Sequence, residues 1–188
     1  MIPFNWVDVF LLFYIVLIIK DGEKSDVVTE VLKLIGILLG TFISLHYYVV
    51  LGHFIQGTIF VPAGMEQLYG YGILLAGIVL LIPFIRRGWL VLLNVELPVK
   101  IEKTGRILLS FIRAVLLCGL IFVALLLSNR ASIIQGARES FSARLIGRLS
   151  FNIYKVMMAG ITKIIPMEKA NEEIFSLYDT DSQPKQVK

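Results

Sequence analysis

Long runs of apolar residues with at most one charge each, separated by short charged segments, dominate the first two thirds of the chain. The runs extend over Ile2–Ile19, Val31–Leu51, Leu68–Ile85 and Ile107–Ser128. A helix needs about 20 apolar residues to cross a hydrocarbon core of about 30 Å, and each run is close to that length. The pattern therefore predicts an all-α membrane protein with about four transmembrane helices in residues 1–129.

The composition agrees with a membrane protein. Hydrophobic residues make up 57% of the chain, charged residues only 17%, and the mean hydropathy is +0.81, whereas soluble domains carry about 25% charged residues. The single cysteine, Cys118, excludes an intrachain disulfide and a multi-thiolate metal site. No Lys or Arg precedes Lys20, so the first run lacks the basic start of a cleaved secretory signal and is expected to stay in the membrane.

The distribution of basic residues predicts an orientation. Five basic residues lie in the connection 86–106, three lysines lie in 20–33, and neither Lys nor Arg occurs in 52–67. Because basic loops stay on the cytoplasmic side, we expect the first two connections in the cytoplasm and both termini and residues 52–67 outside. Half of the basic residues follow residue 129 and oppose this orientation, but long segments translocate largely regardless of charge.

Small residues recur at helical spacing in two of the predicted helices. Gly36, Gly40 and Ser44 follow one another every four residues, and Gly72 and Ala76 repeat the spacing in the third helix. In lipid, small side chains let helix backbones approach closely. We expect both stripes to form helix contacts, although glycine is also simply frequent in membrane helices.

The segment 130–166 has a different pattern. From Arg138 to Ile165 the apolar residues recur at helical spacing and predict an amphipathic helix. Its basic face would carry Arg144, Arg148 and Lys155, opposite an apolar face of Leu145, Leu149, Ile153, Val156, Met157 and Ile164. Such a helix suits the headgroup layer of a lipid bilayer, and equally an apolar contact with a partner protein. Residues 167–188 are polar and are expected to form a flexible tail.

Asp8, Glu30 and Arg113 are charged residues within or beside the predicted spans, where a charge is costly and marks a candidate functional site. Asp8 lies near the start of the first helix, where a carboxylate accepts backbone N–H groups and suits the helix dipole; a proton or ion site is the alternative. Glu30 lies in the first turn of the second helix. Arg113 can extend toward the cytoplasmic surface or pair with an acid, and the topology favours Glu30.

The sequence contains no Walker loop, no G-x-S-x-G and no H-E-x-x-H motif. His46 and His53 have no acid or thiolate close by in sequence, and together with Tyr47 and Tyr48 they predict an interfacial aromatic belt rather than a metal site. We therefore expect no catalytic residue, no metal and no cofactor. No basic soluble segment indicates nucleic-acid binding.

Several short motifs carry a family resemblance. They are Trp6-Val7-Asp8, Glu30 at the start of the second helix, His46-Tyr47-Tyr48, Glu102-Lys103-Thr104-Gly105 and Phe111-Ile112-Arg113. With the four short spans, they make residues 1–130 resemble the colicin V production protein (CvpA) family of bacterial inner-membrane proteins. The resemblance implies a multi-pass protein associated with toxin production or export and with envelope maintenance, and it transfers no catalytic residue.

Two functions remain open from the sequence. The first is a non-enzymatic scaffold or assembly subunit that works as a homo-oligomer or with other membrane-protein subunits. The second is a small oligomeric transporter or channel in which Asp8, Glu30 and Arg113 line a polar path. A transport path usually needs several polar groups near the membrane midplane, and the apolar runs have almost none there. The sequence therefore favours the scaffold.

Overall fold

The computed structural model describes residues 5–58, 60–62, 64–90, 99–164, 171 and 174. Within these residues the chain is helical and contains no strand, which confirms the predicted all-α class. A helix occupies each of the four apolar runs. The helices are α1 (Trp6–Gly22), α2 (Val27–Thr58), α3 (Glu66–Leu90), α4 (Val99–Leu126), α5 (Ala131–Glu139), α6 (Phe141–Leu145) and α7 (Leu149–Ile164).

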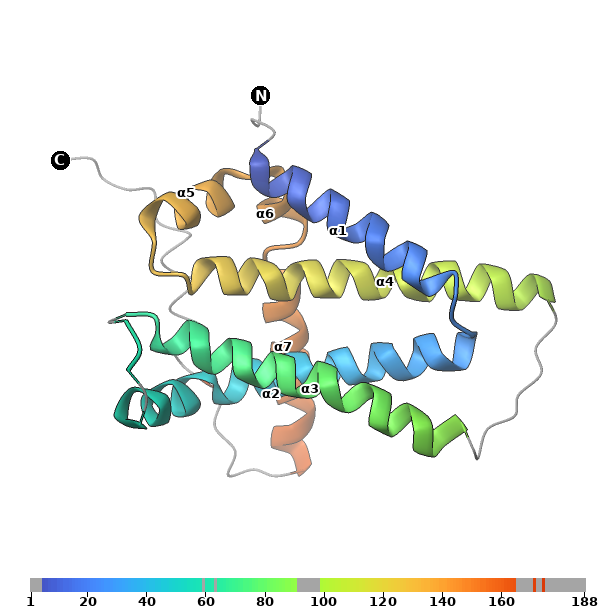
Figure 1. The fold of residues 1–188 in the computed structure, drawn as a ribbon, viewed down its shortest axis with the longest axis horizontal. Coiled ribbons are helices and arrows are strands. Elements are labelled where there is room, and N and C mark those ends of the chain that lie inside the picture. The colour runs from blue at the N-terminus through green and yellow to red at the C-terminus, as the bar shows by residue number, and fades with distance from the viewer. Residues whose placement is uncertain are drawn as a thin grey trace.

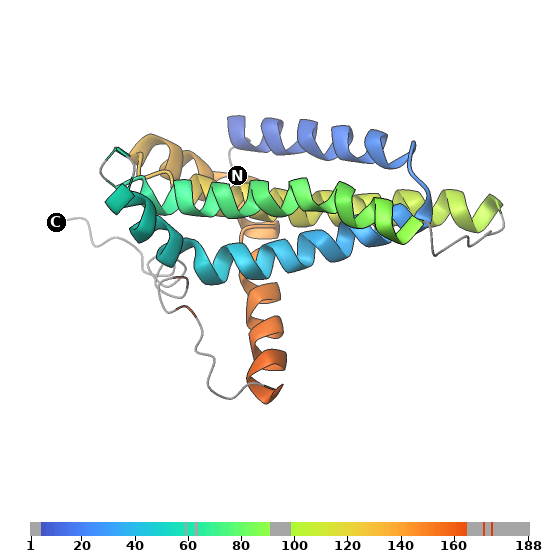
Figure 2. The same ribbon diagram turned by 60° about the horizontal axis from the view of Figure 1, so that its bottom comes forward.

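Helices α1 to α4 run along a common direction and form a bundle, with α1 beside α4 and α2 beside α3 (Figure 1). Helices α5 and α6 fold back over the start of α1, while α7 runs across the bundle and stands out from it (Figure 2). Two helices are long and apolar enough to cross a membrane: Val27–Thr58, with a mean hydropathy of 2.0, and Glu102–Leu126, with 2.6. The apolar stretch of α3, Glu66–Leu81, is shorter.

Both ends of α1 have a clear local cause. The side chain of Asn5 accepts a hydrogen bond from the Trp6 N–H at 2.7 Å, and the Asp8 carboxylate accepts one from the Asn5 N–H at 2.9 Å. This reciprocal capping satisfies N–H groups that the first helical turn leaves without partners. At the other end, a Cβ on Gly22 would overlap Ser110 of α4. The glycine therefore lets α1 end directly against α4.

The main hydrophobic core lies between α2, α3 and α4 and is closed by α7. Its fully buried members include Leu45, Tyr48, Tyr71, Leu120, Phe122 and Tyr154. A smaller cluster of Val7, Leu11 and Cys118 joins α1 to α4. The first cluster has more buried members, so it contributes the larger share of the packing contacts between helices.

The stripe of small residues on α2 is buried. Gly36, Gly40 and Ser44 all face the interior, and a Cβ on Gly40 would lie 3.1 Å from Ile78 Cγ2 of α3. The expected contact through Gly72 and Ala76 does not form within this chain, because both residues are exposed and a Cβ on Gly72 would meet no atom within 4 Å.

The closest approach of α2 and α3 is at Gly52 and Gly70. A Cβ on Gly70 would lie 2.5 Å from the Tyr48 carbonyl oxygen and 2.8 Å from the Gly52 nitrogen. Gly52 extends the four-residue spacing that begins at Gly36, so it continues the stripe on α2. Helix α3 holds several closely spaced glycines, and their spacing alone does not tell which of them faces α2.

The prediction of a single amphipathic helix from Arg138 to Ile165 is wrong. Residues 131–164 form three separate helices. At Ser140 the backbone is extended, with φ −70° and ψ 150°, and the Ser140 side chain accepts a hydrogen bond from the Ala143 N–H to start α6. A second break near Gly147 separates α6 from α7. Serine side chains that bind nearby backbone groups compete in this way with a continuous helix. The segment therefore does not form one continuous helix.

The glycine packing predicts opposite effects for two neighbouring substitutions. Alanine is favoured over glycine inside a helix by about 1 kcal/mol, so Gly72→Ala is expected to raise stability slightly. Gly70→Ala should instead lower it by about 1–3 kcal/mol, because the new methyl group pushes the two backbones apart. Thermal unfolding of both detergent-solubilised variants, followed by circular dichroism, tests this. Equal unfolding temperatures would contradict the Gly52–Gly70 contact.

Candidate functional site

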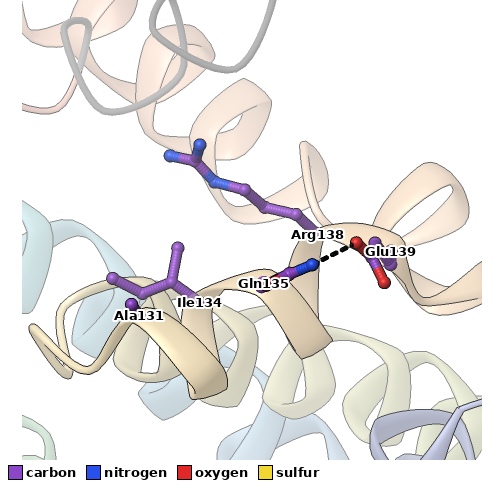
Figure 3. Close-up of a pocket in the computed structure, with 5 residues that line it drawn as sticks. All are labelled: Ala131, Ile134, Gln135, Arg138 and Glu139. Carbon is purple, nitrogen blue, oxygen red and sulfur yellow. Dashed lines mark hydrogen bonds between the residues drawn. The ribbon is translucent and has the colours of Figure 1, made fainter. Parts of the chain in front are cut away.

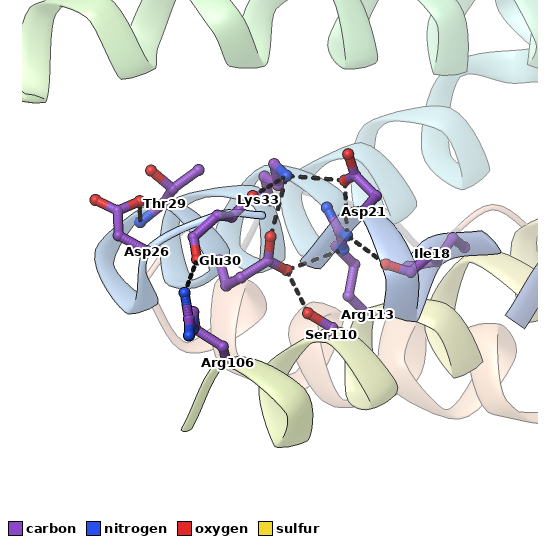
Figure 4. Close-up of polar contacts among 10 residues, drawn as sticks. Ile18, Asp21, Asp26, Thr29, Glu30, Lys33, Arg106, Ser110 and Arg113 are labelled. Atoms are coloured by element: carbon purple, nitrogen blue, oxygen red, sulfur yellow. Dashed lines mark hydrogen bonds and ion pairs between the residues drawn. The ribbon is translucent and has the colours of Figure 1, made fainter. Parts of the chain in front are cut away.

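Four charged side chains from α1, α2 and α4 form a closed ring of alternating sign (Figure 4). Lys33 Nζ lies 3.0 Å from Asp21 Oδ2 and 3.0 Å from Glu30 Oε1. Arg113 Nη2 lies 3.1 Å from the same Asp21 oxygen, and Arg113 Nε lies 3.2 Å from Glu30 Oε2. These four residues are called the charge ring below. Their formal charges cancel.

Glu30 is the most deeply placed member of the charge ring, with a side chain that is 0% exposed. Lys33 donates to Oε1, and the Ser110 hydroxyl donates to Oε2 at 3.0 Å. Its position in the first turn of α2 adds the favourable end of the helix dipole. A buried carboxylate without such partners would be strongly unfavourable, so the surrounding donors permit its burial.

Arg113 joins all three helices. Its side chain is 6% exposed, and Nη2 donates to the Ile18 carbonyl at 3.1 Å as well as to Asp21. Ile18 lies in the last turns of α1, where the negative end of the helix dipole attracts a cation. Of the two alternatives derived from the sequence, pairing with Glu30 is therefore the one observed.

Sequence reasoning missed the other two members of the charge ring. Lys33 follows Glu30 by three residues on α2, a spacing that brings side chains together on a helix, so this pair was open to prediction. Asp21 carried no comparable signal. It reaches Lys33 and Arg113 because α1 packs against α4 and then turns sharply into α2.

Further polar contacts hold the connection between α1 and α2 in place. Arg106 Nη1 donates to the Ser25 carbonyl at 3.2 Å, and Lys33 Nζ donates to the Ser25 hydroxyl at 2.9 Å. Asp26 accepts a hydrogen bond from the Thr29 N–H at 3.2 Å and so helps to start α2 (Figure 4). The connection is thereby tied to both α2 and α4.

Asp21 is the member of the charge ring that contacts solvent, with a side chain that is 62% exposed. Partial burial alone would raise its pKa, but hydrogen bonds and charge attraction from Lys33 and Arg113 outweigh burial. They hold the pKa of this carboxyl below its ordinary value of 3.8. Asp21 therefore stays ionised throughout the neutral range.

Asp8 forms a second polar cluster at the opposite end of α1. Its carboxylate is 3% exposed and accepts hydrogen bonds from the N–H groups of Asn5 at 2.9 Å, Phe141 at 3.1 Å and Ser142 at 2.7 Å, and from the Ser142 hydroxyl. The expected role at the start of a helix is confirmed. The same carboxylate also links the start of α6 to α1. Asn5, Asp8, Phe141 and Ser142 are called the Asp8 cluster below.

The basic face expected in the C-terminal segment forms only in part. Arg148 and Lys155 are exposed, whereas the structure describes only the backbone of Arg144. The fully buried residues of α7 are Ser150, Tyr154 and Met158, and of the expected apolar face Leu149 and Ile153 pack partly against the main core. Val156 and Leu145 of that expected face are 72% and 67% exposed. The break before α7 rotates its axis and changes which residues meet the bundle. Of the tail 167–188, only Asn171 and Ile174 lie among the described residues.

His46 and Tyr48 belong to the packing of the bundle rather than to an interfacial belt. His46 Nδ1 lies 3.0 Å from the Tyr154 hydroxyl, and the imidazole stacks on Phe42. Asn171 donates its N–H to the same hydroxyl at 2.9 Å. Tyr48 is 1% exposed, while Tyr47 keeps the exposed position expected of it. The belt interpretation fails for His46, which contacts α7, and for Tyr48, which packs against Tyr71 of α3, whereas Tyr47 and His53 are exposed.

A half-open pocket of about 610 Å³ lies along α5 and is lined by Ala131, Ile134, Gln135, Arg138 and Glu139 (Figure 3). Gln135 Nε2 donates to Glu139 Oε1 at 2.8 Å across its floor. Among the residues that the structure describes, no group of three or more His, Cys, Asp or Glu side chains could hold a metal ion. The charge ring consists of charges that neutralise one another, and the Asp8 cluster consists of one carboxylate bound by neutral donors.

Comparison with known proteins finds no family model, no curated protein and no solved structure that matches this chain. The resemblance to the CvpA family therefore stays a prediction from sequence motifs.

The charge ring predicts coupled stability effects. Arg113→Ala or Glu30→Ala removes one partner of a buried charge. The loss should stay below the roughly 3–5 kcal/mol typical of a broken buried pair, because Glu30 keeps Lys33 and Arg113 keeps Asp21. The double variant should recover part of that loss, because Asp21 and Lys33 then still neutralise each other. Free energies of unfolding in mild detergent for the four proteins give the coupling directly. Arg130→Ala, at an exposed arginine, is the control. Strictly additive losses would show that the two residues act independently.

Asp21 also predicts a pH dependence with a defined sign. Its pKa is lower in the folded protein than in the unfolded chain, so its contribution to stability is complete above about pH 4 and disappears as the pH falls through the folded-state pKa. The unfolding temperature of the wild type should therefore drop more steeply below about pH 4 than that of Asp21→Asn. If the unfolding temperatures of the two proteins fell equally steeply below about pH 4, Asp21 would not have this role.

Proposed function

We propose that the protein is a non-enzymatic, multi-pass protein of the bacterial inner membrane that acts as a scaffold or assembly subunit. Its resemblance to the CvpA family places this role in envelope maintenance or in toxin production and export. One observation carries the proposal. The buried charged residues that the structure describes, Asp8, Glu30 and Arg113, are bound by other groups of the chain, while the outward faces of the bundle helices carry large apolar side chains.

Large apolar side chains point outward from every helix of the bundle. Examples are Phe13 of α1 at 61% exposure, Phe54 of α2 at 69%, Leu80 of α3 at 68% and Leu108 of α4 at 58%. Monomeric soluble proteins rarely expose contiguous apolar patches larger than a few hundred Å². Apolar surface on all sides of the bundle is typical of helices surrounded by lipid.

The two polar clusters lie at the ends of α1. Asp8 and Asp21 are separated by about 20 Å along the helix, at about 1.5 Å per residue. Polar groups at both ends and an apolar surface between them fit a helix that crosses the hydrocarbon core. Because that core is about 30 Å thick, the bilayer would have to thin around α1. This arrangement supports a crossing by α1 in addition to those of α2 and α4.

The charge ring supports a scaffold more than a transporter. The ring is neutral and closed, and it forms hydrogen bonds with the Ile18 carbonyl and the Ser110 hydroxyl. Its charged groups therefore already bind partners within the protein. Between the charge ring and the Asp8 cluster, the buried polar groups of α2 are the neutral hydroxyls of Thr41 and Ser44. A transport path usually needs more polar groups near the midplane. A role through surface contacts with other membrane proteins is therefore the better fit.

The membrane topology gives the first test. On a Cys118→Ala background, a membrane-impermeant maleimide added to intact spheroplasts should label Gly57→Cys and spare Lys103→Cys until the membrane is opened. Both positions are exposed in the structure, so accessibility reports the side of the membrane. Labelling of Lys103→Cys but not Gly57→Cys would reverse the proposed orientation.

Reconstitution separates the scaffold from the transporter. Vesicles carrying the purified protein should leak protons and small ions no faster than protein-free vesicles. In native membranes, a photo-crosslinker at the exposed Leu80 should capture a second copy or another membrane protein. An ion flux that Glu30→Gln abolishes while the protein stays folded would favour the transporter instead.

A further inference from the structure

Helix α7 has three distinct faces. At about 100° per residue, Ser150, Tyr154 and Met158 form one side, and all three are buried against the bundle. The other two sides of α7 lie next to each other and point away from the bundle. The residues of α7 that point outward have two different chemistries, and these are not mixed around the helix.

The first outward sector is polar and basic. It holds Asn152, Lys155, Ala159, Thr162 and Lys163, all exposed, within about 100° of arc. Arg148, also exposed, directly precedes the helix. Helix α7 contains no Asp or Glu, so its net charge is positive. Among the described residues, no ion pair forms with Arg148, Lys155 or Lys163.

The second outward sector is apolar and lies between the basic sector and the bundle. Its outward members are Val156, Met157 and Gly160, and it continues into Leu149 and Ile153, which pack partly against the main core. Val156 is 72% exposed, and Ile153 and Met157 are partly exposed. An apolar strip beside a basic strip is typical of helices that lie in the boundary between headgroups and acyl chains.

The position of α7 in the fold agrees with such a boundary. Ile146, just before α7, packs against the cluster of Val7, Leu11 and Cys118. Because Val7 and Leu11 lie in the first turns of α1, helix α7 leaves the bundle near the start of that helix. It then runs across the direction of the bundle helices (Figure 2). If those helices cross the membrane, α7 lies in the membrane plane.

We propose that α7 is an interfacial helix that binds anionic phospholipid headgroups through Arg148, Lys155 and Lys163 while its apolar sector lies against acyl chains. The inference rests on the proposed membrane function and adds a lipid class and a site to it. Charge complementarity selects the lipid, because three exposed cations without a neighbouring acid on α7 attract the anionic surface of a membrane.

Depth measurements in vesicles test the placement of α7. On the full-length Cys118→Ala protein, an environment-sensitive fluorophore is attached in turn at Phe13→Cys, Asn152→Cys and Val156→Cys. We expect the probe at 156 to be quenched by lipids with a quencher near the headgroup, the probe at 13 by deep quenchers, and the probe at 152 by aqueous iodide. These expectations follow from the exposure of all three side chains.

The three probes distinguish the two proposals. Quenching of the probe at 13 by aqueous iodide would overturn the proposed membrane span of α1. If deep lipid quenchers reach the probe at 13 while aqueous iodide quenches the probe at 156, only the interfacial placement of α7 is overturned. A probe at 156 that neither lipid nor aqueous quenchers reach would show that protein covers the helix, which also contradicts the inference.

The lipid class is tested by stability in nanodiscs. Nanodiscs of phosphatidylcholine with phosphatidylglycerol should raise the unfolding temperature by at least about 2 °C over phosphatidylcholine alone. The double variant Lys155→Gln/Lys163→Gln should lose this difference. The control Lys24→Gln/Lys103→Gln removes two exposed lysines from the other end of the bundle and should keep it. The same difference in both double variants would overturn the inference.

Discussion

Burial of the Glu30 carboxylate is the constraint on which the arrangement of α1, α2 and α4 depends. A fully buried carboxylate needs donors close by, and α4 brings two of them, Arg113 and Ser110. Arg113 in turn needs Asp21 and the Ile18 carbonyl, both from α1. Three helices that are distant in sequence are thus held in one relative position by a single set of polar contacts.

The Asp8 cluster does the same at the other end of α1, by different means. There the carboxylate binds backbone N–H groups of Phe141 and Ser142 instead of cations. This contact decides where α6 begins, and thereby where α7 leaves the bundle. Between the two ends, α1 contacts α4 through apolar side chains such as Leu11 and through a weak hydrogen bond from the Cys118 thiol to the Leu11 carbonyl. Polar contacts therefore fix the position of α1, and apolar contacts fill the space between them.

Glycine decides how closely the other pair of bundle helices can pack. The backbones of α2 and α3 meet where Gly70 faces Tyr48 and Gly52, with no room for a side chain. In lipid, such close contact replaces the hydrophobic drive that water supplies to soluble proteins. The glycines that point outward, Gly72 among them, face open space. Their position relative to the bundle, not their spacing, determines their effect.

The helical class, the four apolar helices and the local role of Asp8 follow from the sequence, because hydrophobic runs and helix capping depend on neighbouring residues. The pairing of Glu30 with Arg113 could also be predicted, since few charges lie in the apolar runs. Three features depend on the three-dimensional arrangement: Asp21 joins this pair, Gly70 rather than Gly72 faces α2, and α7 turns across the bundle. Each of these depends on how helices rotate and cross, which is set by contacts between distant segments and leaves no periodic signal in the chain.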